Sequence, residues 1–232
     1  MQTLDIIYED NDIILCRKPS GVATQTKRLG QQDMESLLKN YRAKKKEPPY
    51  IGVVHRLDQP VEGLMVFAKN QKAAAHLSKQ VQQRVIGKHY YAISAFSPKE
   101  KEGILEDYLV TDQKTNKTTV VKVSKEKGLS KDAKRALLEY KVIEEKEGLT
   151  LFDILLHTGR QHQIRVQMAH MGCPLVGDTK YGKEGDLGTR EGLLLCSYRL
   201  SFVHPGTQKQ MDVSIQPTAE AFRKFSDIGK LL

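Results

Sequence analysis

The sequence predicts an α+β protein whose strands form a mixed, mainly antiparallel sheet. Short apolar runs bounded by Gly, Pro, Asn and Asp recur along the chain, among them GLMVFAKN, KHYYAISAF, LTLFDILLH and LLLCSYRLSF. Such runs are typical of strands. Clear helical periodicity is found in only a few places, and no regular helical crossover separates the strands. This pattern favours an antiparallel α+β sheet over a doubly wound parallel one.

Two helices are indicated by apolar side chains at helical spacing. In residues 71–87 apolar side chains repeat every four residues up to Val85, after Asn70 as an N-cap and before Gly87 as a stop. Residues 31–46 show a second apolar face of the same kind. Both segments are therefore expected to be helical.

Charge and composition narrow the class of protein. The 232 residues are enough to bury a core without disulfide or metal staples. Lys and Arg number 37 against 28 Asp and Glu, a net charge of +9 that suits a polyanionic partner such as RNA, DNA or an acidic membrane. No run approaches 18 apolar residues, and the N-terminus is acidic where a secretory signal needs Lys or Arg. We expect a soluble, cytoplasmic protein.

The three cysteines are odd in number and far apart, at Cys16, Cys173 and Cys196. This spacing argues against a disulfide framework and against a Cys-x-x-Cys zinc ribbon. Reduced, buried thiols are expected instead.

A basic stretch lies between Asp112 and Ala136, with eight Lys or Arg against three acids. We expect a hairpin and loops there. A solvated surface is one interpretation of such a stretch. The excess has one sign, however, and RAKKK at residues 42–46 repeats it, which favours contact with phosphates.

The stretch VVHRLDQPVEGLMVFAKN, residues 53–70, puts a polar cluster at a break between two apolar runs. Pro60 restricts Gln59 to extended backbone and Gly63 frees the chain, so the turn that carries Asp58 should be well defined. Asp58 has two interpretations. It forms a structural ion pair with Arg56 or another cation, or it is an ionised carboxylate available as nucleophile or base.

A second polar stretch, HTGRQHQIRVQMAHMGCPLVGDTKYG, covers residues 157–182. Thr158 is suited to cap a helix that starts near Gly159 or Arg160 and ends at Gly172. Between residues 157 and 176 there is no acid, so nothing local neutralises Arg160 or Arg165. An incoming phosphate or carboxylate is the expected partner of these guanidinium groups.

Several other chemistries lack their usual motifs. His157, His162 and His170 are separated by 5 and 8 residues without a neighbouring acid, which disfavours a zinc site. The sequence has no GxxxxGK[ST] loop, no GxGxxG turn and no Gly-x-Ser-x-Gly elbow. The sequence therefore offers no motif for nucleotide hydrolysis, for hydride transfer or for hydrolysis by a serine nucleophile.

Five motifs in order resemble the RluA-type RNA pseudouridine synthases, and the resemblance runs from about residue 5 to residue 216. They are KPSG at 18–21, HRLD at 55–58, KHYYA at 88–92, HTGRQHQIR at 157–165 and PLVGDTKYG at 174–182. The resemblance implies the pseudouridine synthase fold, a long, bisected, mainly antiparallel mixed sheet with flanking helices and loops. We expect one catalytic domain over residues 1–232, with two halves around a central cleft and no S4 RNA-binding module.

The resemblance also implies roles for individual residues. Asp58 is the expected catalytic aspartate, Tyr90 packs against or hydrogen-bonds the target uracil, and Arg165 pairs with Asp58. Arg56 helps to displace or replace the flipped base. The reaction is the isomerisation of uridine to pseudouridine in ribosomal or transfer RNA, without cofactor or metal, and we expect a monomer. Further residues are expected to contact the substrate: His55, Leu57, Arg160, His162, Gln163 and Ile164, with Lys125, Lys127 and Lys131 at the RNA backbone.

The chemistry of a base in RNA supports the same assignment. A base must leave the helical stack to react, which requires an aromatic or apolar pocket and cations for the splayed backbone. Tyr90 offers the platform. Arg165 could keep Asp58 ionised and also stabilise the negative charge on the departing uracil.

The sequence departs from the family at two places. The Thr-Ser pair that usually precedes Gly63 is Val61 and Glu62 here, which puts substrate contact at this point in question. The His that commonly follows HQIR by two positions is Gln167, which keeps hydrogen bonding but does not titrate near neutral pH.

Two other functions remain open from the sequence. One is a non-catalytic RNA-binding or RNA-folding protein on the same scaffold, which Glu62 and the basic stretch would suit. The other is hydrolysis of a different glycosidic bond by Asp58, although the sequence shows no second carboxylate paired with it.

Overall fold

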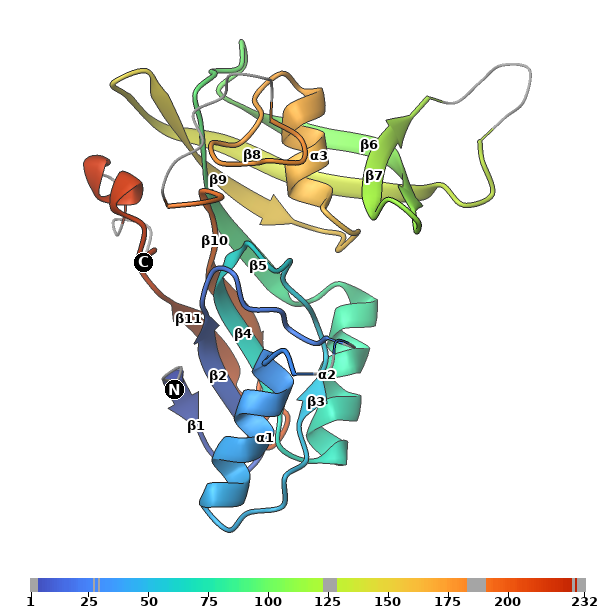
Figure 1. The fold of residues 1–232 in the computed structure, drawn as a ribbon, viewed down its shortest axis with the longest axis vertical. Helices are drawn as coiled ribbons and strands as arrows, with labels where there is room; N and C mark the ends of the chain where they lie inside the picture. Colours follow the sequence, from blue (N-terminus) through green and yellow to red (C-terminus); the bar gives the residue numbers. More distant parts are fainter. Residues whose placement is uncertain are drawn as a thin grey trace. The chain divides into compact units, whose positions relative to one another are not determined.

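Strands make up most of the regular structure, as the sequence predicts. The computed structural model describes residues 4–26, 28, 30–122, 129–182, 191–226 and 228. These residues form eleven strands, three α-helices and one short 3₁₀ helix (Figure 1). None of the helices in these ranges is both long and apolar enough to cross a membrane.

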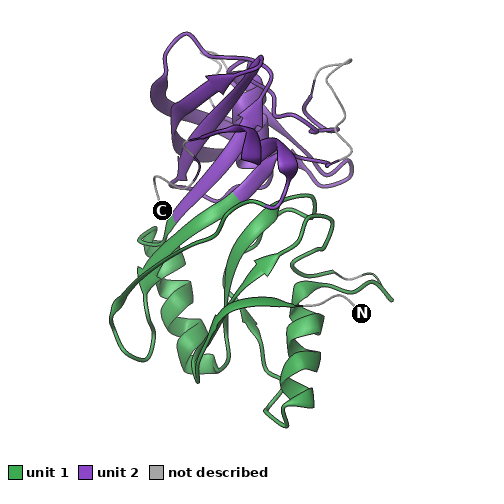
Figure 2. Cartoon of the chain, turned by 90° about the vertical axis from the view of Figure 1, so that its left-hand side faces the viewer, with its two compact units in different colours: residues 1–87, 197–217, 232 green, residues 88–196, 218–231 purple. Residues whose placement is uncertain are grey.

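The chain divides into two compact units (Figure 2). Unit 1 contains residues 1–87, 197–217 and 232, and unit 2 contains residues 88–196 and 218–231. One catalytic domain with two halves around a cleft stays a prediction.

Unit 1 is built around strand β4 (Glu62–Ala68), in the strand order β1-β2-β4-β10, with β11 beside β10 and β3 beside β4. All seven residues of β4 are buried, which explains why LMVFA, residues 64–68, is a continuous apolar run rather than an alternating one. The pairs β1–β2, β2–β4, β3–β4 and β10–β11 are antiparallel. The other strands are β1 (Asp5–Glu9), β2 (Ile13–Lys18), β3 (Gly52–Val53), β10 (Leu195–Val203) and β11 (Gln210–Ser214).

Gly63, at the start of β4, has a φ of +144°, which L side chains rarely adopt. A Cβ at this position would lie 2.5 Å from the backbone nitrogen and oxygen of Ser197 in β10. The backbones of β4 and β10 therefore approach each other at a point where only glycine fits.

Helix α2 (Gln71–Gln83) packs on the sheet of unit 1. The side chain of Asn70 accepts a 2.8 Å hydrogen bond from the backbone N–H of Ala73, which confirms the predicted N-cap. The prediction was wrong at the other end, because Arg84 adopts a left-handed φ of 59° and Val85 is 58% exposed instead of facing inward. The helix shares its core with the sheet through Ile13, Leu15, Val66, Ala68, Ala73, Leu77, Ile86 and Phe202.

Helix α1 (Met34–Lys44) lies within the predicted segment 31–46. Asp33 caps it by accepting a 2.8 Å hydrogen bond from the backbone N–H of Ser36. Met34 and Leu38 are fully buried, as expected for its apolar face.

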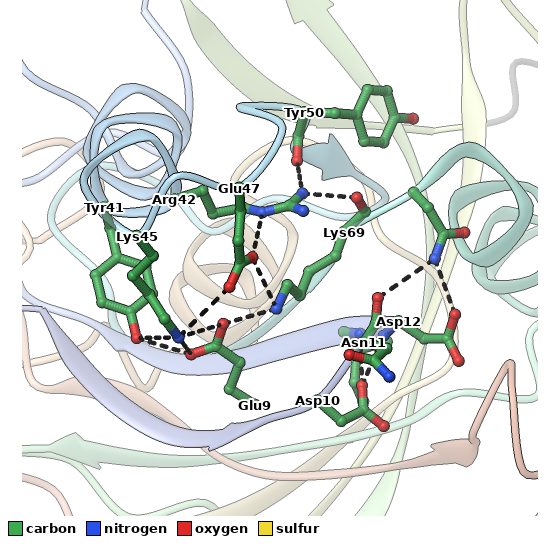
Figure 3. A network of polar contacts seen from close by, with 12 residues as sticks. Glu9, Asp10, Asn11, Asp12, Tyr41, Arg42, Lys45, Glu47, Tyr50 and Lys69 are labelled. Carbon is green, nitrogen blue, oxygen red and sulfur yellow. Dashed lines mark hydrogen bonds and ion pairs between the residues drawn. The ribbon is translucent and has the colours of Figure 1, made fainter.

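A network of ion pairs ties the end of α1 to β1 and to the end of β4 (Figure 3). The ammonium of Lys69, 7% exposed, lies 2.7 Å from Glu9 and 3.2 Å from Glu47, and Arg42 contacts Glu47 at 3.1 Å. Burial would raise the pKa of Glu9, but hydrogen bonds from Lys69, Tyr41 and Lys45 lower it to about 2.

The ammonium of Lys45, in the basic run RAKKK, lies 3.2 Å from Glu9. Two of the five residues of RAKKK, the buried Arg42 and the exposed Lys45, thus form ion pairs with acids of the protein itself. The phosphate contact expected for this run receives no support from them.

Unit 2 contains an antiparallel run of strands in the order β5-β9-β8-β6-β7. The β8–β9 turn uses Glu147 and Gly148, with φ values of 52° and 74°, as a two-residue type I′ hairpin requires. Of the hairpin predicted in the basic stretch, the turn at residues 113–116 and the second strand, β7, lie in that stretch, while the first strand, β6, precedes it. The strands are β5 (Gly87–Ser94), β6 (Glu102–Asp112), β7 (Lys117–Val121), β8 (Lys134–Lys146) and β9 (Leu149–Leu156).

Helix α3 (Gln163–His170) begins later than predicted. Thr158 is not its cap, because the threonine hydroxyl bonds to the Gln163 side chain and to the backbone N–H of Leu137, each at 2.8 Å. The helix instead follows His162, which has a left-handed φ of 53°. Its Val166 packs against Leu109 of β6 and Ala136 of β8.

Candidate active site

Asp58 lies in the connection from β3 to β4, and its side chain is half-buried. Its carbonyl accepts a 3.0 Å hydrogen bond from the backbone N–H of Val61, which closes a tight turn around Pro60. The well-defined turn predicted for this residue is confirmed.

The segment 18–24, which contains the KPSG motif, forms hydrogen bonds to this turn. Thr24 Oγ1 donates to the carbonyl of Leu57 at 3.0 Å and lies 3.2 Å from the Leu57 N–H, from which it accepts. Ser20 Oγ donates to the carbonyl of Pro60 at 2.8 Å. The residues on both sides of Asp58 are therefore fixed by hydroxyl groups.

Gln59, next to Asp58, is held by three hydrogen bonds. Its carbonyl accepts from the backbone N–H of Gly21 at 2.9 Å and from the ammonium of Lys18 at 3.0 Å. Its side-chain amide donates to the carbonyl of Gly21 at 3.0 Å. Since the four carbonyls from Leu57 to Pro60 all accept hydrogen bonds, the backbone that carries Asp58 has little freedom.

Lys18 is fully buried, which is rare for a lysine. Its ammonium donates to three carbonyls, those of Pro19 at 2.9 Å, Val22 at 2.6 Å and Gln59 at 3.0 Å. Burial lowers the pKa of Lys18 to about 7, while the negative charges of Asp58 and Glu62 act in the opposite direction. The buried ammonium of Lys18 therefore links the KPSG segment to the turn that carries Asp58.

The sequence pointed to KPSG only through the family resemblance, and the role of Lys18 was missed. A lysine at the end of an apolar run, directly before proline, is the only signal it offered.

The family departure at Val61 and Glu62 has an internal explanation. Val61 is 3% and Glu62 6% exposed. Glu62 Oε1 lies 2.5 Å from Arg17 Nη1, and Arg17 Nε lies 2.8 Å from Asp5. The acidic residue at position 62 thus belongs to an ion pair of unit 1.

The other residues of HRLD divide into two groups. His55 Nε2 accepts a 3.1 Å hydrogen bond from the backbone N–H of Val66, and Leu57 is 7% exposed. The His55 side chain thus binds the backbone of β4, and the Leu57 side chain is buried in the protein. The side chain of Arg56, in contrast, is exposed, as an RNA-contacting residue requires.

Tyr90 and Arg165 belong to unit 2. Tyr90 is on β5, opposite Ile154 of β9, and is 5% exposed. Arg165 is on α3 and is also 5% exposed. Its predicted pairing with Asp58, which belongs to unit 1, stays a prediction.

Within unit 2, Arg165 forms a bidentate ion pair with Asp178. The two contacts are Nε to Oδ2 at 2.8 Å and Nη2 to Oδ1 at 2.7 Å. Burial would raise the pKa of Asp178, but Arg165 and the backbone N–H groups of Lys180 and Tyr181 lower it below its ordinary value. The expectation that nothing local neutralises Arg165 was wrong, because its acid lies two residues beyond the range 157–176.

Tyr181 supports the same arginine. Its ring centroid lies 5.2 Å from Arg165 Cζ, within the range of a cation–π contact. The Tyr181 hydroxyl accepts from the backbone N–H of Thr118 at 2.9 Å and shares a 2.8 Å hydrogen bond with His162 Nδ1. The residues around Arg165 therefore come from α3, β7 and the loop after α3.

With this geometry in view, the sequence matches the family described as RNA pseudouridylate synthase over residues 12–170. The chain belongs to this family. The matched range includes Asp58, Tyr90 and Arg165.

Individual RNA pseudouridine synthases are similar to the chain over most of its length. An uncharacterized RNA pseudouridine synthase of Mycoplasma pneumoniae is 33% identical, over 97% of this chain and 69% of that protein. The dual-specificity RNA pseudouridine synthase RluA of Vibrio parahaemolyticus is 38% identical, over 87% of this chain and 78% of that protein.

A solved structure, human RNA pseudouridylate synthase domain containing 4, superimposes with a TM-score of 0.74 at 22% identity, over 94% of this chain and 90% of that one. The predicted pseudouridine synthase fold is thereby confirmed.

The remaining predicted substrate contacts of this pseudouridine synthase stay predictions. The Gln163 amide is engaged internally, since it donates to Leu137 O at 3.2 Å and accepts from the backbone N–H of Arg160 at 3.0 Å. Ile164 is 4% and His162 8% exposed. Arg160 is half-buried and donates through Nε to the carbonyl of Arg135 at 3.0 Å.

Gln167, the second family departure, is fully buried. Its amide donates to the carbonyl of Leu105 at 3.2 Å and to Asp107 at 2.8 Å. It keeps hydrogen bonding, as predicted. Among the basic residues expected at the RNA backbone, Lys131 is exposed, whereas Lys125 and Lys127 lie outside the described residues.

In the described part of the chain, one group of side chains comes close enough to share a metal ion, namely Asp10, Asp12 and His204. His204 Nδ1 accepts hydrogen bonds from the backbone N–H groups of Gly206 at 3.1 Å and Thr207 at 3.0 Å. The neutral ring therefore carries its proton on Nε2, which lies 2.8 Å from Asp10. Metal-bound imidazoles donate their other N–H instead. This arrangement fits a histidine–carboxylate pair and does not fit a metal ligand.

Proposed function

We propose that this enzyme isomerises selected uridines of ribosomal or transfer RNA to pseudouridine, with Asp58 as its catalytic carboxylate. Ribosomal and transfer RNA are the substrate classes that fit the family and the net charge of +9. We also propose a cytoplasmic monomer that needs no cofactor.

The observation that carries the proposal is the immobilised turn around Asp58. Every carbonyl from Leu57 to Pro60 is hydrogen-bonded, and the buried ammonium of Lys18 is one of the donors. A carboxylate that must meet a flipped nucleotide in one orientation gains from such a rigid support. A purely structural acid would not need its backbone fixed by a separate segment of the chain.

The reaction balances without an added reagent. The bond between uracil N1 and ribose C1′ breaks, the ring turns, and a bond forms between C5 and C1′. The proton on C5 is released, and N1 gains a proton. Asp58 serves by attack on the ribose, by attack on the ring or as a base, and Arg165 stabilises the negative charge on the free uracil.

Tyr90 would stack on or hydrogen-bond the target base, and the exposed Arg56 would take the place of the base in the RNA stack. Both roles agree with what base flipping requires, namely an aromatic surface and a side chain that stabilises the distorted strand.

Release of tritium tests the proposal. Purified protein is incubated with cellular ribosomal and transfer RNA that carries tritium at uracil C5. We expect release with the wild type and none with Asp58→Asn, at equal RNA affinity. Asp212→Asn, which removes an exposed carboxylate of β11, is the control and should release tritium like the wild type.

The outcomes separate the alternatives. Tight RNA binding without tritium release in the wild type would favour a non-catalytic RNA-binding protein. Free uracil or ribose among the products would favour glycoside hydrolysis. Arg165→Ala should lose activity mainly in turnover, because the charge that Arg165 opposes is greatest while the bond breaks.

A further inference from the structure

We infer that Asp178 is a positioning residue of the reaction, which holds the guanidinium of Arg165 in the orientation that turnover requires. The inference rests on the proposed function and on the role given there to Arg165.

The carboxylate fixes the guanidinium in two ways at once. Two parallel hydrogen bonds, at 2.8 and 2.7 Å, leave the plane of the Arg165 group no freedom to rotate. The pair is also dry, since the Asp178 side chain is 0% and that of Arg165 is 6% exposed. The fork uses Nε and Nη2 and therefore determines in which direction Nη1 points.

Asp178 also places the ring under the guanidinium. Its Oδ1 accepts from the backbone N–H of Lys180 at 2.9 Å and of Tyr181 at 3.1 Å. Tyr181 lies 5.2 Å below Arg165 Cζ and is tied through its hydroxyl to His162, at the start of α3. The contacts form a closed circuit from α3 through Arg165, Asp178 and Tyr181 back to α3.

The ion pair with Asp178 also affects the net charge around Arg165. Because Asp178 neutralises Arg165, the arginine contributes directed N–H groups more than net positive charge. Asp178→Asn keeps the size of the side chain but replaces an acceptor oxygen with a donor amide that faces the guanidinium. The guanidinium should then turn, while the net charge of unit 2 becomes more positive.

Turnover should therefore fall without any loss of RNA binding. We expect Asp178→Asn to lower the single-turnover rate of tritium release by about 10- to 100-fold, the effect typical of a misplaced catalytic group. Its RNA affinity should be unchanged or higher because a negative charge is lost. General damage to the fold would weaken both. Asp178→Glu, which keeps the charge, should recover part of the rate.

Asp212→Asn is the matched control. Asp212 pairs with Arg199 in the same forked way, at 2.7 and 2.5 Å, but on β10 and β11 of unit 1. Asp212→Asn removes the same negative charge, so its RNA affinity should change no more than that of Asp178→Asn, while its turnover should stay as in the wild type.

A double variant tests whether Asp178 acts through Arg165. In Arg165→Ala/Asp178→Asn, the second change should cause no further loss of rate relative to Arg165→Ala, because the group to be positioned is gone. This comparison also decides the matter if Asp178→Asn alone does not fold, since the double variant buries neither charge.

An additive loss in the double variant, or wild-type turnover in Asp178→Asn, would overturn the inference. Neither result would affect the proposed function, which fails if the wild type releases no tritium, if Asp58→Asn releases tritium like the wild type, or if free uracil or ribose is formed.

Discussion

The buried ammonium of Lys18 donates a 3.0 Å hydrogen bond to the carbonyl of Gln59, the residue that follows Asp58. This contact joins the end of β2 to the turn before β4. It makes the position of Asp58 depend on a segment about forty residues earlier in the chain, since the two residues are separated by 41 positions.

Lys18 predicts a pH dependence of stability. Its pKa is about 7 in the folded protein and 10.5 in the reference state, so the unfolded chain binds the proton more tightly. The penalty of burying the charge is therefore complete below pH 7 and is relieved as the pH rises toward 10.5.

Relative to Lys18→Met, the wild type should gain free energy of unfolding over this window, by up to about 1.4 kcal/mol per pH unit. Urea unfolding of both proteins at pH 6.5, 8 and 9.5 measures the difference. A constant difference across the three pH values would contradict it.

Thr24→Val should loosen the Asp58 turn. The variant keeps the shape of the side chain but removes the hydroxyl from the N–H and the carbonyl of Leu57. Unsatisfied buried groups of this kind cost about 1–3 kcal/mol. We expect this loss in urea unfolding together with a several-fold lower turnover at saturating RNA.

Thr150→Val, at a buried threonine of β9, is the control for that substitution. Its turnover should match the wild type. If both variants lose turnover equally, the hydroxyl of Thr24 has no special role.

Glu62→Gln should destabilise unit 1. The carboxylate is 8% exposed and lies 2.5 Å from Arg17 Nη1, so its loss should cost about 1–3 kcal/mol. Asp5→Asn removes the other partner of the same guanidinium, but Asp5 is 53% exposed, and the cost should stay below about 1 kcal/mol. Equal losses in urea unfolding would show that burial of Glu62 does not matter.

Metal ions should not stabilise the protein through the cluster of Asp10, Asp12 and His204. The proton on His204 Nε2 occupies the position a metal would need. Thermal unfolding should therefore be the same with added Zn²⁺ and with a chelator. A stabilisation by Zn²⁺ that disappears in His204→Ala would refute this assignment.

The basic stretch between Asp112 and Ala136 is predicted to contact RNA phosphates. Replacement of Lys125, Lys127 and Lys131 by Ala should weaken RNA binding and flatten its dependence on salt by up to about one unit of slope per lost phosphate contact. Lys72→Ala, at an exposed lysine of α2, should leave the slope unchanged. The same slope in both variants would mean that the basic stretch is only solvated.

Local features of the fold were predictable because they depend on near neighbours in the chain. The cap at Asn70 and the turn around Pro60 follow from side chains within three residues of each other. The start of α3 was predicted wrongly, because Thr158 had a more distant partner, Leu137, that competes with a capping role.

The supports of the candidate site were missed for the same reason. Lys18 and Gln59 are 41 residues apart, and Arg165 and Asp178 are 13 apart with a loop between them. No periodicity encodes such pairs, because only the folded chain brings them together. Asp58 itself could be singled out from the sequence, since its motif is contiguous.

The close approach at Gly63 limits how this enzyme could be redesigned. A Cβ at this position would lie 2.5 Å from the backbone of Ser197, so any side chain there would push β4 and β10 apart. The turn that carries Asp58 leads directly into β4 and would be displaced as well. A library aimed at new uridine preferences should therefore leave this glycine untouched and diversify the solvent-facing guanidinium at position 56 instead.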